Sequence, residues 1–165
     1  MTAGSIASTV GVRQIAGATR ALSSLPEIDY VDLFTLELGS DPGASPERWA
    51  RAMFGDVPSV GEQVIWRGLL GLRLNSRRSP DTVAGWRIGG RGADWIRLET
   101  ESWFLSCNLL VQATGDEVSL ATFLRYDRWV GHVVWPPLSA IHRGLVPGVL
   151  CGAAARIPAS HRGNG

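Results

Sequence analysis

The spacing of apolar side chains changes from a helical to a strand period after a polar loop at residues 75–81. Before the loop, residues 28–38 alternate with apolar groups on both sides, which predicts a strand. Beyond the loop, glycine-containing turns at 89–92 and 114–116 connect successive strands. The strands expected there cover about 84–90, 94–100, 103–113 and 117–127. The pattern therefore predicts an antiparallel meander.

Two short helices are expected between the first strand and the meander. Ser45 has the features of an N-cap, with Pro46 at the first helical position and Glu47 near the positive end of the helix dipole. Gly55 and the residues after it end this helix. The second helix covers about 60–72 and its apolar stripe is interrupted by glycines.

The last two strands of the meander place apolar side chains on one face. Leu105, Leu109 and Val111 share that face, while the opposite face is mixed. A helix over 137–156 is expected to cover the apolar face, with a kink at Pro147. Its predicted contact stripe is Leu138, Ile141, Leu145, Val149 and Ala153.

The length of 165 residues predicts one domain. Residues 1–25 are rich in small and polar side chains, and we expect a flexible N-terminal arm there. The domain is then expected to cover 26–157, with a disordered tail at 158–165. The order of elements is that of an α+β helix-grip fold, in which a curved antiparallel sheet wraps around a long C-terminal helix.

Four stretches of sequence carry a resemblance to a known family. They are Asp29-Tyr30-Val31-Asp32-Leu33-Phe34, Pro46 to Phe54, Trp66 to Arg73, and Gly131-His132-Val133-Val134-Trp135 leading to Ile141-His142-Arg143. From Tyr30 onward the chain resembles a bacterial family of unknown function in the SRPBCC (START-like) superfamily. The resemblance implies the helix-grip fold and a cavity between sheet and helix, which in many members of the superfamily holds an apolar ligand.

Composition and charge exclude several classes of function. The net charge is +1, so there is no electrostatic reason to expect nucleic acid as a partner. All 16 basic residues are arginine, which excludes a Schiff-base lysine and a P-loop lysine. We find no membrane-spanning run and no secretory signal, and expect a cytoplasmic protein whose cysteines, Cys107 and Cys151, are reduced.

Motifs for metals and cofactors are also missing. His132, His142 and His161 do not have metal-ligand spacing, and we expect no metal and no cofactor. The glycines between 85 and 92 lie between two strands, where a turn is favoured over a dinucleotide site.

Two residues are candidates for acid–base chemistry. His142 on the last helix either forms a hydrogen bond that joins helix to sheet or acts as a general base in the cavity. Glu99 lies on a solvated sheet face or at the cavity mouth, where burial would raise its pKa.

The residues expected to bind an apolar ligand are aromatic and aliphatic side chains of the sheet and helices, with two hydroxyl groups. They are Trp66, Trp103, Leu105, Leu109, Thr122, Tyr126, Ile141 and Leu145.

Three functions remain open at this level. The first is binding of a hydrophobic small molecule, lipid-like or polyketide-like. The second is an enzyme of the cyclase or dehydratase type, in which the cavity positions a reactive chain and one acid–base pair is sufficient. The third is a homodimer formed through an exposed apolar patch of Phe104, Ala121 and Phe123.

Overall fold

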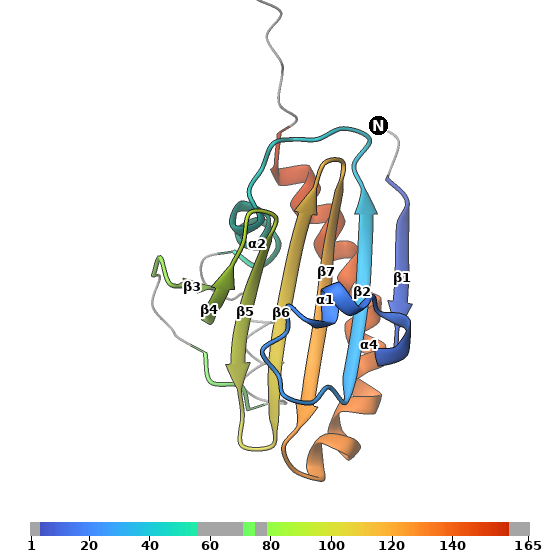
Figure 1. Cartoon of the computed structure of the whole chain (residues 1–165), viewed down its shortest axis with the longest axis vertical. Helices are drawn as coiled ribbons and strands as arrows, with labels where there is room; N and C mark the ends of the chain where they lie inside the picture. Colours follow the sequence, from blue (N-terminus) through green and yellow to red (C-terminus); the bar gives the residue numbers. More distant parts are fainter. Residues whose placement is uncertain (1–3, 56–70, 75–78, 159–165) are drawn as a thin grey trace, which may run out of the picture.

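The computed structural model describes residues 4–55, 71–74 and 79–158 of the chain. Within these ranges seven strands form one open antiparallel sheet in the order β1-β2-β7-β6-β5-β4-β3. The strands are β1 (Ile6–Val10), β2 (Tyr30–Glu37), β3 (Thr82–Val83), β4 (Trp86–Arg91), β5 (Trp95–Glu101), β6 (Leu105–Thr114) and β7 (Glu117–Tyr126). The helices are η1 (Val12–Gln14), α1 (Gly17–Arg20), α2 (Pro46–Phe54) and α4 (Val130–Arg156). The fold is α+β, with a long C-terminal helix against the sheet (Figure 1).

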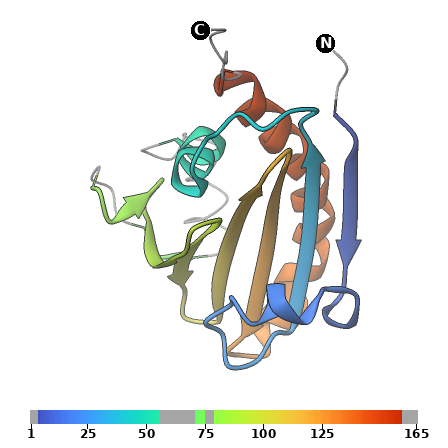
Figure 2. The same cartoon turned by 45° about the horizontal axis from the view of Figure 1, so that its top comes forward.

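The elements form layers on both sides of the sheet. Helix α4 runs behind the sheet in Figure 1, whereas α1 lies in front of it. Helix α2 packs against α4 and against β6, on the same side of the sheet as α4 (Figure 2). We call the face toward α2 and α4 the inner face, and the face toward α1 the outer face.

The register of the central strands decides which side chains face α4. Strand β2 pairs with β7, and Asp32 lies opposite Thr122. Strand β7 pairs in turn with β6, where Thr122 lies opposite Leu109. Because side chains alternate between the two faces, Asp32, Thr122 and Leu109 form a row across the inner face.

The predicted strands and the first helix are confirmed to within a few residues. All five expected strands are present as β2, β4, β5, β6 and β7. Helix α2 begins as expected, because the Ser45 side chain accepts a hydrogen bond from the Arg48 amide at 3.2 Å. Gly55 follows α2 with a φ of 77°, a backbone conformation that favours glycine.

Strand β1 is an element that the sequence analysis missed. Residues 1–25, expected to be a flexible arm, contain β1, η1 and α1, and β1 pairs with the edge of β2. The sequence of β1, Ile-Ala-Ser-Thr-Val, is short and has little apolar alternation. Its pairing depends on the unsatisfied edge of β2, which local sequence does not reveal.

The N-terminal segment covers the outer face and removes the apolar patch expected there. Ile15 packs with Val31, Leu110, Ala121 and Phe123 in a second cluster on that face, which we call the outer cluster. Ala121 and Phe123 are fully buried, and Phe104 is 3% exposed in the main core. The prediction of an exposed patch was therefore wrong, and a homodimer stays a prediction without this surface to support it.

Helix α4 is longer than expected and contacts the sheet through a different stripe. It begins at Val130, not near Pro137, and continues through Pro136, Pro137 and Pro147. A glycine at position 131 allows the helix to begin at Val130, because the Cβ atom of any other residue would lie only 2.8 Å from the Tyr126 ring, which is too close. The residues buried along α4 are Gly131, Trp135, Ser139, Val146, Leu150 and Ala153. Only Ala153 of the expected stripe is among them, since both flanks of this helix are apolar and periodicity alone does not choose between them.

Helix α4 is also long and apolar enough to cross a membrane, and only 22% of its apolar 18-residue stretch is buried. The apolar pattern of the sequence had not predicted a membrane-spanning segment. The helix also contains His142 and Arg143 near its middle, and ionisable side chains are costly inside a bilayer. The absence of a membrane span therefore stays a prediction.

Two expected features lie outside the described residues. They are Trp66 and nearly all of the second helix expected at 60–72, of which only residues 71 and 72 are described. The expected tail is likewise described only at Pro158.

Candidate functional site

A cavity of about 620 Å³ lies between the inner face of the sheet and helices α2 and α4. We call it the helix cavity. Its walls are mostly aliphatic and aromatic side chains, which suits an apolar guest. Those contributed by the sheet are Trp86, Leu105, Cys107, Leu109, Leu120, Thr122 and Leu124, and those of α4 include Trp135, Leu138, Ile141, His142, Leu145, Val146 and Val149.

Six of the predicted site residues meet in the helix cavity: Leu105, Leu109, Thr122, Ile141, His142 and Leu145. Ile141 and Leu145 are 58% and 54% exposed, so they do not pack against the sheet. They lie instead at the open side of the cavity, one helical turn apart. The sequence thus predicted their place at the cavity but not their exposure.

Two other predicted ligand-binding residues do not line the helix cavity. Trp103 is 57% exposed and packs its ring edge-on against Phe104 at 5.0 Å. Tyr126 lies edge-on to the His132 ring at 4.6 Å, beyond the end of the cavity. Burial and the nearby Asp29 carboxylate raise the pKa of Tyr126.

His142 is held at the wall of the helix cavity by two hydrogen-bonding groups of the sheet. Its Nε2 atom lies 3.1 Å from Oδ2 of Asp32 and 3.1 Å from Oγ1 of Thr122. Asp32 on β2 and Thr122 on β7 are neighbours in the cross-strand row, so both reach the same ring nitrogen. The helix-to-sheet hydrogen bond predicted for His142 is present, and its side chain still keeps 23% of its surface exposed.

Asp32 is fully buried, and Tyr30 is its second partner. The Tyr30 hydroxyl donates a hydrogen bond of 2.6 Å to the Asp32 Oδ2 atom. Burial and this carboxylate raise the pKa of Tyr30, and Arg143 acts in the opposite direction. Burial and Asp32 also raise the pKa of the Cys107 thiol, which is therefore a poor nucleophile.

Sequence reasoning missed the role of Asp32. The signal was an acid in the inner set of β2, between the apolar residues Tyr30 and Phe34. A carboxylate at a position that faces a core needs partners, and one of them, His142, lies 110 residues further along the chain. Without the register of β2 on β7, nothing in the sequence joins Asp32 to His142.

Two polar atoms of this cluster have no hydrogen-bond partner among the described residues. They are Oδ1 of Asp32 and Nε1 of Trp135, and both are buried. The Trp135 ring lies 5.3 Å from the Tyr30 ring and 5.5 Å from the His142 ring. We call Tyr30, Asp32, Thr122, Trp135 and His142 the polar cluster of the helix cavity.

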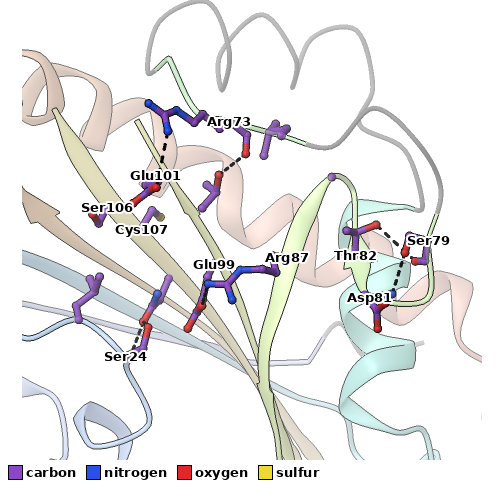
Figure 3. A pocket seen from close by; sticks show the side chains of 15 residues that line it. Ser24, Arg73, Ser79, Asp81, Thr82, Arg87, Glu99, Glu101, Ser106 and Cys107 are labelled. Atoms are coloured by element: carbon purple, nitrogen blue, oxygen red, sulfur yellow. Dashed lines mark hydrogen bonds and ion pairs between the residues drawn. The ribbon is translucent and has the colours of Figure 1, made fainter. Parts of the chain in front are cut away.

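Glu99 lies on the outer face, away from the helix cavity. Its carboxylate forms an ion pair with Arg87 (Figure 3) and a second ion pair, at 2.8 Å, with Arg97. Burial acts to raise the pKa of Glu99, but hydrogen bonds from Ser24 and Arg97 and the charges of both arginines outweigh it and lower the pKa. The expectation of a raised pKa was therefore wrong, because Arg97 on the same strand and Arg87 on the neighbouring strand β4 both pair with Glu99. Glu99 and His142 do not share a site.

A second pocket, of about 780 Å³, lies at the sheet edge around Glu99 and is shown in Figure 3. Its lining mixes polar and apolar side chains, and four of its five charged residues are paired with each other: Arg87 with Glu99, and Arg73 with Glu101 at 3.9 Å. Ser24 is bound to the Asn108 side chain in the same pocket. These pairings leave little capacity for a charged guest, so the helix cavity is the better candidate site.

The residues of the described part of the chain contain no group of three or more histidine, cysteine, aspartate or glutamate side chains that could hold a metal ion. Both cysteines are free thiols; Cys107 is buried and Cys151 is exposed on α4.

No family model, curated protein sequence or solved structure matches this chain.

Proposed function

We propose that the chain has a helix-grip fold and binds a hydrophobic small molecule in the helix cavity. The observation that carries the proposal is a cavity of about 620 Å³ whose walls are apolar on both the sheet and the helix side. The order of elements and the resemblance to the SRPBCC superfamily support the same function. A lipid-like or polyketide-like molecule has the apolar surface that such walls bind.

Two glycines of α4 allow a direct test. Gly148 lines the helix cavity and Gly144, one turn earlier, does not. A Cβ at either position would meet no atom within 4 Å. Gly148→Phe therefore adds a ring at a residue of the cavity wall where the Cβ position is open, and Gly144→Phe adds the same ring to the same helix at a residue outside the cavity.

The measurement is the fluorescence of N-phenyl-1-naphthylamine, an uncharged apolar probe. We expect saturable binding to the wild type, at least tenfold weaker binding to Gly148→Phe, and unchanged binding to Gly144→Phe. Thermal unfolding checks that both variants fold. Equal binding by all three proteins, or no saturable binding by the wild type, would contradict the proposal.

A second candidate function is favoured by the Asp32–His142 pair. An imidazole anchored by a buried carboxylate is suited to accept a proton, as a cyclase or dehydratase requires. A generic test is 5-nitrobenzisoxazole: a base takes its C–H proton, the N–O bond breaks and a phenolate is released. Release above the buffer rate that is lost in His142→Phe would support catalysis, and an unchanged rate would exclude His142 as the base.

A further inference from the structure

The polar cluster has hydrogen-bonding capacity that the chain does not use. The Asp32 carboxylate can only accept hydrogen bonds, so the His142 Nε2 atom next to it carries a hydrogen. In the neutral imidazole this leaves Nδ1 as an acceptor. His142 lines the helix cavity, and its Nε2 edge is occupied by Asp32 and Thr122. A guest in the helix cavity would therefore contact the rest of the His142 ring.

Two further unused groups belong to the same cluster. Asp32 Oδ1 is an acceptor and Trp135 Nε1 is a donor, and both are buried without a partner among the described residues. Asp32 does not line the helix cavity, and neither of these two atoms has accessible surface, so a guest in the cavity cannot reach them. His142 is therefore the group of the cluster whose unused hydrogen-bonding capacity a guest can meet.

We propose that the molecule in the helix cavity carries a hydroxyl group that donates a hydrogen bond to His142 at the cavity wall. This inference rests on the proposed function of the cavity. A hydroxyl has one hydrogen, which it can donate to the Nδ1 atom that the contacts of Nε2 leave as an acceptor. It is also a small neutral group, so it brings no charge into a mostly apolar cavity.

Other oxygen groups match the cluster less well. A carbonyl or an ether has no hydrogen to donate and leaves the His142 acceptor unpaired. A carboxylate also lacks a hydrogen to donate, and its charge is costly to bury among apolar walls. The apolar part of the guest would then lie along the leucines of β6 and β7 toward Met53 and Phe54 of α2.

The test compares two isomers of the same composition, octan-1-ol and heptyl methyl ether, by isothermal titration calorimetry. We expect the alcohol to bind about tenfold more tightly to the wild type. Without hydrogen bonds in the cavity the order would reverse, because burying an unpaired hydroxyl is unfavourable. Binding of both isomers with equal affinity, or tighter binding of the ether, would overturn this inference and leave the proposed function intact. If neither isomer binds, the proposed function itself fails.

Variants locate the preference. His142→Phe keeps an aromatic ring at the wall but removes the acceptor, and we expect it to bind the ether as before and to lose the preference for the alcohol. His132→Phe is the matched control, since His132 is exposed on the same helix and packs on Tyr126 outside the cavity. A preference that persists in His142→Phe, or is lost in His132→Phe, would contradict the assignment. If His142→Phe does not fold, the comparison of the two isomers on the wild type still tests whether the cavity prefers the alcohol.

Discussion

At the scale of single residues, Asp32 determines the chemistry of its neighbours. It holds the Nε2 edge of His142, keeps the Tyr30 hydroxyl protonated and adds to the burial effect on Cys107. A buried carboxylate with several partners is costly to disturb, because the removal of one partner leaves charge without compensation. Changes around Asp32 should therefore affect stability as well as binding.

Tyr30 gives a prediction for alkaline pH. Its pKa is raised above 10 in the folded protein, so folding favours the protonated hydroxyl. That contribution is complete below pH 10 and is lost as the pH rises further. Denaturant unfolding between pH 8 and 11 should show a fall in the free energy of unfolding above pH 10. Tyr30→Phe should show a smaller fall, together with a loss of about 1–3 kcal/mol at pH 8 from the missing hydrogen bond. Equal slopes in the two proteins would contradict this role.

Glu99 gives the opposite prediction for acid. Its pKa is lowered from 4.5, so its contribution to stability is complete above that pH and is lost as the pH falls. Glu99→Gln should lower the free energy of unfolding at pH 7 by about 1–3 kcal/mol and should flatten its decline below pH 4.5. Glu117→Gln is the control, because Glu117 is exposed at the start of β7. An equal change in both variants would show that the ion pairs of Glu99 do not stabilise the fold.

At the scale of elements, the N-terminal segment is the part that local sequence describes least well. It adds β1 to the edge of the sheet and places Ile15 in the outer cluster, where it is 3% exposed. The segment therefore covers and stabilises the outer face of the sheet, just as α2 and α4 cover and stabilise the inner face.

Ile15→Ala should lower the free energy of unfolding by about 2–5 kcal/mol, because it leaves a void against Val31 and Phe123. Val10→Ala, at a 41% exposed position of β1, should change it by less than about 0.5 kcal/mol. Urea denaturation measures both. A flexible arm would instead make the two substitutions equally harmless.

The strands and α2 could be predicted because their signals are local. Alternation identified β6 and β7, and Ser45 with Pro46 identified the start of α2. The phase of α4 could not be predicted, because apolar residues surround that helix and its contact with the sheet depends on Gly131 fitting under Tyr126. The same limit applies to the site: His142 was found from its position, whereas the place of Asp32 beside His142 and the pairing of Arg87 with Glu99 depend on how the strands pair.

At the scale of the whole molecule, the sheet and α4 meet along a stripe but do not fill the space between them. Leu138 and Val149 are partly buried, and Ile141 and Leu145 are mostly exposed, so the cavity continues to the open flank of the helix. Val133 is also exposed on α4, outside the cavity. An apolar molecule can bind in the helix cavity or on the exposed surface of α4. The methyl groups that it contacts distinguish these two sites.

The most direct test is therefore an NMR measurement of nuclear Overhauser effects between octan-1-ol and the methyl groups of the protein. The alcohol chain should show contacts to Leu109 on β6 and to Leu138 and Leu145 on α4, and none to Val133. Contacts to Val133 without contacts to Leu109 would place the alcohol on the surface of the helix and contradict a binding cavity between helix and sheet.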